Sequence, residues 1–137
     1  MVMETRRFLA KIEHLEEMLD YILMGLESLE LTAKQKHQIR LVCEEALVNV
    51  IHYAYLAEGG LVTISYKIFI ESQEVEIILE DEGVAFNPLE SEDPDLEIDI
   101  HERKIGGLGI YMIKNIMDKV CYERVEGKNR LYLKKKF

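Results

Sequence analysis

This sequence has few cysteines and no long apolar run, and its basic residues are outnumbered by acids. Its 137 residues include two cysteines, Cys43 and Cys121, which lie far apart in apolar stretches without a CxxC or Cys/His pattern. That spacing favours reduced thiols in a cytosolic protein over a disulfide framework or a metal site. No apolar run approaches the roughly 18 residues of a membrane span, and the basic start lacks the apolar region of a signal peptide. We therefore expect a cytoplasmic protein without membrane contact.

The shortage of basic charge excludes a further class of partner. Lysine and arginine total 17 against 26 acids, which gives a net charge of −9. Binding to the phosphates of nucleic acid needs a basic face, so we expect no direct nucleic-acid contact. Residues 90–104 hold seven acids and two bases, whereas residues 127–137 hold five bases and no acid. We interpret the lysines at 134–136 as a solvated strand end.

Hydrophobic periodicity predicts two helices in the first half of the chain. Apolar residues recur at helical spacing from about residue 8 to residue 26. A second helix should begin at Thr32, because Thr32-Ala-Lys-Gln35 has the order of a capping box, and should end near Tyr53 or Tyr55. Its expected buried face consists of Val42, Cys43, Ala46, Val50 and Tyr53.

The period then changes to that of strands. Residues 62–70 alternate, a polar turn follows, and residues 75–79 resume the alternation, which predicts an antiparallel hairpin. A third helix should follow the glycines at 106–109, before two short strands at 120–125 and 130–136. Residues 1–137 are thus expected to form one α+β domain, a two-layer sandwich with a mixed, mostly antiparallel sheet and helices on one face.

The connection between Gly83 and Ile105 is too long for an ordinary loop. It spans about 22 residues, with Pro88 and Pro94 as breakers and little periodicity. Structureless loops of that length in compact domains are usually functional lids or disordered segments. We expect a lid at about residues 84–105.

Polar residues interrupt the second helix between Cys43 and Tyr55, where most of the other residues are apolar. Asn49 and His52 follow Glu45 by four and seven residues, so all three side chains lie along one face of the helix. A solvated stripe is one interpretation. The other is a carboxylate that accepts a proton beside an amide oxygen that ligates Mg²⁺, which often takes only one or two protein oxygens. A cage of all three residues is less suitable, because asparagine is a poor transition-metal ligand.

Two further polar segments allow either a turn or a ligand. Asp81 and Gly83 follow an apolar strand, where a carboxylate could accept from an amine such as adenine N6 and would reject guanine O6. Glycines 106, 107 and 109 precede a helix, whose unpaired amides attract anions. Neither GxGxxG nor G-K-[ST] is present. A helix end contributes only about 0.3–1 kcal/mol per charge at an exposed site. A metal ion and nearby basic residues would therefore have to supply the rest of the positive charge, and the candidates are Arg103, Lys104, Lys128 and Arg130.

The order of these segments is more specific than any one of them. Helix E-x-x-x-N, strand D-x-G, a long loop and G-x-G at a helix start together resemble the GHKL ATP-binding superfamily. The phrases EEALVNVIHYAY, EDEGVAFNPL and GGLGIYMIKNIMD look most like the anti-sigma factor serine kinases, and the likeness covers about residues 31–137. It implies a Bergerat-type fold and the use of Mg²⁺ and ATP. It also implies a homodimer that phosphorylates a small anti-anti-sigma (STAS-type) partner, with a sigma factor as a further partner.

The resemblance also implies roles for single residues. Glu45 matches the catalytic base, Asn49 the Mg²⁺ ligand and Asp81 the adenine-binding carboxylate. Two departures from the family concern nucleotide-binding positions. Ala85 stands where many members have a second glycine after Asp81. Asn129 stands in place of the threonine of a late Gly-Thr pair and is the substitute hydrogen-bonding residue expected there. The remaining implied nucleotide-binding positions are Gly83, Arg103, Lys104, Gly106, Gly107, Leu108 and Gly109.

The leading hypothesis is therefore an anti-sigma factor serine kinase. Histidine autophosphorylation is disfavoured, because His14 lacks the acid and the proline that usually follow a phosphoacceptor histidine. Two alternatives remain open at this point. One is a module that binds ATP or ADP only to shape a surface that sequesters a regulator, and the other is a structural domain without a ligand.

Overall fold

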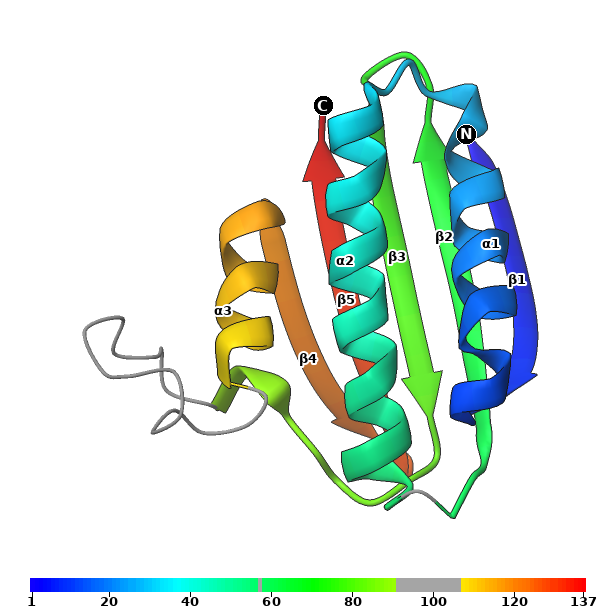
Figure 1. Cartoon of the computed structure of the whole chain (residues 1–137), viewed down its shortest axis with the longest axis vertical. Coiled ribbons are helices and arrows are strands. Elements are labelled where there is room, and N and C mark those ends of the chain that lie inside the picture. The colour runs from blue at the N-terminus through cyan, green and yellow to red at the C-terminus, as the bar shows by residue number, and fades with distance from the viewer. Residues whose placement is uncertain (57, 91–106) are drawn as a thin grey trace.

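The protein is a two-layer α+β sandwich, as expected from the sequence (Figure 1). The computed structural model describes residues 1–56, 58–90 and 107–137, with the backbone alone for residues 107 and 108. The strands are β1 (Val2–Leu9), β2 (Leu61–Phe69), β3 (Glu74–Asp81), β4 (Lys119–Val125) and β5 (Lys128–Lys136). The helices are α1 (Leu15–Gly25), α2 (Ala33–Asn49) and α3 (Gly107–Ile116).

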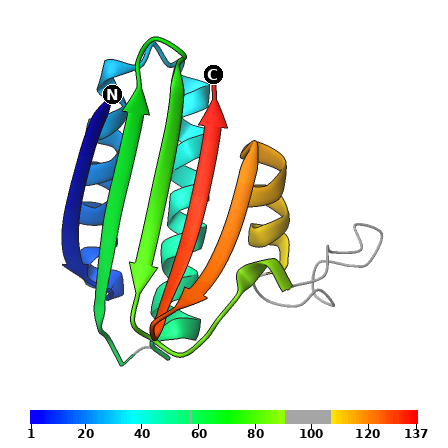
Figure 2. The same ribbon diagram turned by 180° about the vertical axis from the view of Figure 1, so that it is seen from behind.

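One sheet with the order β1-β2-β3-β5-β4 forms the first layer. The three helices cover one of its faces and leave the other bare (Figures 1 and 2). All the strand pairings among the described residues are antiparallel. The sheet is therefore antiparallel rather than mixed, and the β2–β3 hairpin is confirmed.

Strand β1 is the element that the sequence prediction missed. It pairs with β2 from Val2↔Ile68 to Leu9↔Leu61, and α1 begins only at Leu15, after a 3-10 turn at Ile12–His14. The expected helix from about residue 8 was thus wrong in its first turns. In β1 only Phe8 is buried, so this edge strand lacks the alternation of apolar residues that marks the inner strands.

Helix α2 crosses the middle of the sheet and has a complete capping box at its start. The Gln35 amide donates to Thr32 Oγ1 over 3.1 Å, and the Thr32 amide donates to Gln35 Oε1 over 2.9 Å. At its other end α2 continues into a π-helical turn at Val50–Ala54. The wider turn changes which residues face the sheet. Ile51 and Ala54 are buried, whereas Tyr53, which we expected in the buried face, is 36% exposed.

The core lies between the helices and the covered face of the sheet. Alternate residues of β2 and β3 point into it, which is the arrangement that their period of two predicts. Both cysteines are free thiols, and burial raises the pKa of Cys43 to about 12. Within the described part of the chain, no helix is both long enough and apolar enough to cross a bilayer.

The capping box should make a measurable contribution to stability. Replacing Thr32 by alanine removes the acceptor for a first-turn amide and should lower the free energy of unfolding by about 1 kcal/mol. Thr32→Ser keeps the hydroxyl and should stay close to the wild type. Urea denaturation of the three proteins measures the difference, and an alanine variant as stable as the serine variant would contradict the assignment.

Candidate functional site

The buried polar side chains of the protein gather at one place. Among the described residues, Asn49, Asp81 and Asn129 are the polar side chains that are buried, at 6%, 4% and 4% exposure. They come from the end of α2, the end of β3 and the start of β5, which meet at the lower end of the molecule in Figure 1. All three line one cavity, together with Phe86 and Tyr122. The convergence expected from the sequence is therefore present for these three residues.

Asp81 is held by two hydrogen bonds that end on the same oxygen. The Gly83 amide and the Asn129 side-chain nitrogen each donate to Asp81 Oδ1 over 2.9 Å. Burial has the largest effect on the carboxyl group and raises the pKa of Asp81 above its usual value, while these two donors oppose the rise. Asp81 is thus a buried acceptor whose charge depends on the protein groups around it.

The side-chain amide of Asn49 has a hydrogen-bond donor without an acceptor in the described part of the chain. Its amide nitrogen is buried and has no partner among the described residues, a condition that costs about 1–3 kcal/mol. A half-turn of the amide exchanges its oxygen and nitrogen at almost no change in shape, and the oxygen is a ligand type that Mg²⁺ accepts. The residue therefore fits a bound cation, or a ligand atom that reaches the end of α2.

Glu45 lies one turn before Asn49 and is partly buried against α3. A methyl group added at Gly109 would stand 2.2 Å from Glu45 Oε2, so the first turn of α3 lies directly against this carboxylate. Burial, and then the charge of Glu44, raise the pKa of Glu45. A raised pKa makes a carboxylate a stronger base, which suits it to proton transfer.

Gly83 allows the loop after β3 to approach the end of the π-helical turn. An added methyl group at Gly83 would stand 2.3 Å from the Ala54 carbonyl oxygen. That oxygen accepts from the Val84 amide over 2.8 Å, and Arg124 donates to the Gly83 carbonyl over 2.8 Å. The glycine is required here by the close approach of two backbones.

The other expected site residues divide into three groups. Gly107 and Leu108 begin α3. Arg103, Lys104 and Gly106 lie outside the described residues, as does most of the expected lid at 84–105. His52 is exposed and does not line the cavity.

The suggestion that Lys128 or Arg130 adds charge at the phosphates was wrong. Alternate residues of a strand point to opposite faces, so these two side chains lie on the bare face of the sheet while Asn129 between them faces the cavity. Both pair with Glu80, at 3.5 Å from Lys128 and 2.5 Å from Arg130.

Two aromatic residues that line the cavity, Phe86 and Tyr122, were missed by the sequence prediction. Phe86 stacks on Tyr53 with ring centroids 5.0 Å apart, and the Tyr55 hydroxyl donates to the Leu61 carbonyl and accepts from the Glu82 amide. Tyr122 pairs with buried Leu131 in the register of β4 and β5 and is half-buried at the cavity. The cavity that Phe86 and Tyr122 help to line holds about 20 Å³, room for about one water. A planar base would therefore need a wider cavity than the one in this structure.

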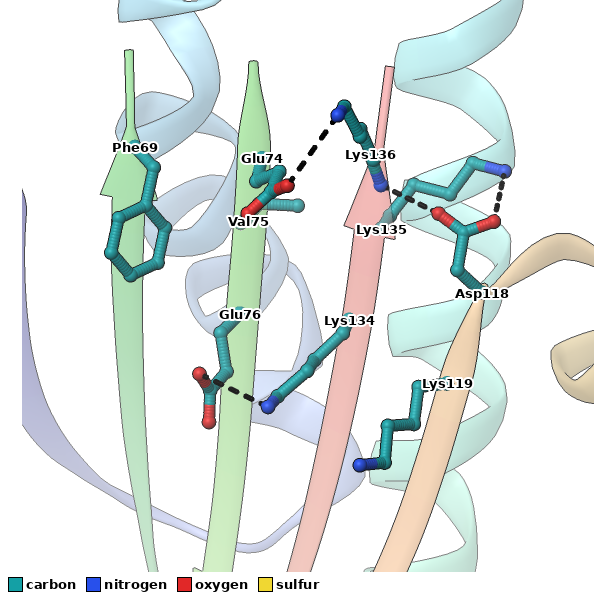
Figure 3. Close-up of a pocket in the computed structure, with 9 residues that line it drawn as sticks. All are labelled: Phe69, Glu74, Val75, Glu76, Asp118, Lys119, Lys134, Lys135 and Lys136. Atoms are coloured by element: carbon teal, nitrogen blue, oxygen red, sulfur yellow. Dashed lines mark hydrogen bonds and ion pairs between the residues drawn. The ribbon is translucent and has the colours of Figure 1, made fainter. Parts of the chain in front are cut away.

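A larger hollow of about 330 Å³ lies at the other end of the sheet (Figure 3). Three of its lysines pair with acids: Lys134 with Glu76 at 3.9 Å, Lys135 with Asp118 at 3.4 Å and Lys136 with Glu74 at 3.9 Å. Exposed pairs of this kind contribute about 0–1 kcal/mol each. Ion pairs of this kind, without buried polar side chains beside them in the described chain, are typical of a solvated surface, so we do not regard this hollow as a ligand site.

Comparison with known proteins gives consistent results. The profile of the histidine kinase-like ATPase domain matches residues 8–135. The anti-sigma F factor of Clostridium acetobutylicum is 30% identical over 139 residues, which cover 96% of this chain and 91% of that protein. The anti-sigma F factor of Geobacillus stearothermophilus is 32% identical, with coverage of 80% and 75%. The serine/threonine-protein kinase BtrW of Bordetella bronchiseptica is 26% identical, with coverage of 74% and 71%.

A solved structure shares the fold. The histidine kinase domain from the blue-light activated histidine kinase EL346 of Erythrobacter litoralis superposes with a TM-score of 0.58 at 13% identity. The superposition covers 88% of this chain and 59% of that one. At that identity the likeness concerns the fold alone.

The two glycines of the site should respond differently to alanine. Gly83→Ala forces the added methyl against a backbone carbonyl and should lower the free energy of unfolding by about 1–3 kcal/mol. Gly109→Ala meets only the end of the Glu45 side chain and gains helix propensity, so its stability should stay within about 1 kcal/mol of the wild type. Chemical denaturation measures both. Equal losses in the two variants would show that the contacts at Gly83 and Gly109 are alike.

Proposed function

Because the chain belongs to the histidine kinase-like ATPase family, we propose that it is an ATP-dependent protein serine kinase of the anti-sigma factor type. It would phosphorylate a small anti-anti-sigma partner and so regulate a sigma factor. The observation that carries the proposal is the clustering of Asn49, Asp81 and Asn129 around one cavity, beside Glu45. The similarity to the anti-sigma F factor of Clostridium acetobutylicum over nearly the whole of both chains supports it.

The adenine base is assigned to the cavity at Asp81. An ionised carboxylate accepts from the N6 amino group of adenine and repels O6 of guanine, which is itself an acceptor. Gly83 lies beside the base, because its lack of a side chain leaves the backbone open to a flat ring. This position of the base directs the phosphates toward the start of α3, where the proposed contacts are Gly107, Leu108 and Gly109, with Arg103, Lys104 and Gly106 preceding them.

The proposed catalytic group is Glu45. Its carboxylate accepts the proton of the incoming serine hydroxyl while the serine oxygen forms a bond to the γ-phosphorus, and the bond from that phosphorus to the β–γ bridging oxygen breaks. The products are phosphoserine, ADP and protonated Glu45. Burial against α3 raises the pKa of Glu45 and so favours proton uptake. The Asn49 amide oxygen would hold Mg²⁺, which when bound neutralises charge on the phosphates.

The setting of the protein forms part of the same proposal. We place it in the cytoplasm, where sigma factors act on transcription. A homodimer is proposed on family grounds, with exposed parts of α1 as the candidate contact. An anti-anti-sigma protein of the STAS type is the proposed acceptor of the phosphoryl group.

Binding of Mg-ATP should stabilise the fold. At about 100 times the dissociation constant, ATP should raise the free energy of unfolding by roughly 2.7 kcal/mol, and GTP should have a much smaller effect. Asp81→Asn removes the charged acceptor and should weaken ATP binding by about 10–100-fold. Thermal or chemical denaturation with each nucleotide measures both effects. Equal stabilisation by ATP and GTP would argue against Asp81 as the adenine contact.

Phosphotransfer should depend on Glu45 far more than nucleotide binding does. In Glu45→Gln the transfer from labelled ATP to a cognate anti-anti-sigma protein should fall about 10²–10⁴-fold, the usual contribution of a general base. The control is Glu76→Gln, which changes an acid on the bare face of the sheet and should leave the rate unchanged. Equal rates for wild type and Glu45→Gln would remove Glu45 from the mechanism. Tight ATP binding without phosphoserine on any partner would favour a module that only sequesters its partner.

A further inference from the structure

The side-chain amide of Asn129 makes every hydrogen bond of which it is capable within the protein. Its nitrogen donates to Asp81 Oδ1 over 2.9 Å and to the Val84 carbonyl over 2.8 Å. Its oxygen accepts from the Phe86 amide over 3.3 Å and from the Tyr122 hydroxyl over 2.5 Å. An amide has two N–H donors and two lone pairs. No capacity is left over for a nucleotide base in this arrangement.

The partners of Asn129 fix which way the amide faces. The Phe86 N–H can only donate and must meet the oxygen, whereas the Val84 carbonyl can only accept and must meet the nitrogen. The nitrogen therefore points at Asp81, which has to accept. Since Gly83 also donates to Asp81 Oδ1, that oxygen is occupied and Oδ2 remains as the acceptor for a ligand in the cavity.

We propose that Asn129 is a specificity-determining residue that selects the nucleotide without touching the base. By donating to Asp81 it keeps this carboxylate an acceptor and orients its second oxygen, while Tyr122 keeps Asn129 itself in place. Asn129 is thus a positioning residue that acts through Asp81. The inference rests on the proposed adenine-binding role of Asp81.

The groups around Asp81 show why the hydrogen bond from Asn129 matters for the charge of this carboxyl group. Asp81 is 4% exposed, and burial favours the uncharged acid. Asn129 is the largest of the influences that favour the charged form, followed by the Gly83 amide and by Arg124 on β4. Without Asn129 the balance moves toward a protonated acid, which would offer a donor suited to guanine O6 and lose an acceptor for adenine N6.

The other titratable groups near Asp81 do not take over the effect of Asn129, which is to favour the ionised carboxylate. The adjacent Glu80 raises the pKa of Asp81. Tyr55, which follows the π-helical turn, and Tyr122 of β4 have hydroxyls whose own pKa values are raised, so they stay uncharged near neutral pH.

The expected pH dependence follows from this charge state. ATP requires ionised Asp81, so its affinity should decline as the pH falls through the pKa that Asp81 has in the free protein. Loss of Asn129 raises that pKa, and the decline should begin at a higher pH. GTP affinity should change in the opposite direction.

The experiment compares Asn129→Ala, Asn129→Thr and Tyr122→Phe with the wild type. Tyr132→Phe is the matched control, since it removes a hydroxyl from the bare face of the same strand pair, where Tyr132 bonds Glu123. Calorimetric titration with Mg-ATP and Mg-GTP between about pH 5.5 and 8.5 should show the ATP-to-GTP preference of Asn129→Ala reduced about tenfold at neutral pH. The midpoint of the pH dependence should move to higher pH. Asn129→Thr, which retains one hydrogen-bond donor, should restore part of the ATP-to-GTP preference and part of the wild-type pH midpoint. Tyr122→Phe should change both quantities in the same direction as Asn129→Ala, but less.

A second readout needs no nucleotide. The carboxyl ¹³C shift of Asp81, followed by NMR against pH, should give a higher pKa in Asn129→Ala than in the wild type and an unchanged one in Tyr132→Phe. An unchanged Asp81 pKa and an unchanged ATP-to-GTP ratio in Asn129→Ala or Asn129→Thr would overturn the inference. If Asn129→Ala does not fold, Asn129→Thr and Tyr122→Phe decide. A wild type that binds neither nucleotide would instead overturn the proposed function, whatever the NMR titration shows.

Discussion

The need to satisfy polar groups inside a small core is the constraint on which the site depends. An unmet polar atom in such a core costs about 1–3 kcal/mol, and the described residues bury three polar side chains. Two of them, Asp81 and Asn129, satisfy one another directly. The third, Asn49, keeps an unpaired amide nitrogen. The arrangement leaves hydrogen-bonding capacity open at Asn49, which a bound ligand would satisfy under the proposed function.

The alternation of the strands separates two kinds of polar chemistry. On the covered face, Asp81 and Asn129 are enclosed and make short, directed bonds that fix orientation. On the bare face, Glu80 pairs with its basic neighbours in contact with solvent, where ion pairs contribute little. Neighbouring residues of β3 and β5 therefore form an enclosed polar cluster on one face of the sheet and a solvated surface on the other. A shift of register by one residue would exchange the two faces.

The sequence was informative where a signal is local and repeated. The capping box at Thr32, the β2–β3 hairpin and the meeting of Asn49 with Asp81 followed from spacing, period and a known motif order. Strand β1 did not, since its pairing comes from β2 and not from its own pattern of apolar residues. The exposure of Tyr53 depends on a π-helical turn that has no sequence signature of its own. The full set of bonds at Asn129 could not be derived either, because it joins three segments whose distances only the fold determines.

The small volume of the cavity at Asp81 has a consequence for how tightly a nucleotide is held. If the base enters only those molecules in which the cavity has widened, the apparent dissociation constant is the intrinsic one divided by the fraction of such open molecules. Each tenfold preference for the closed form then weakens binding tenfold. Substitutions in residues 84–90 could tune the working range of ATP concentration without altering any atom that meets the ligand, and related chains could differ in that range while sharing the same site.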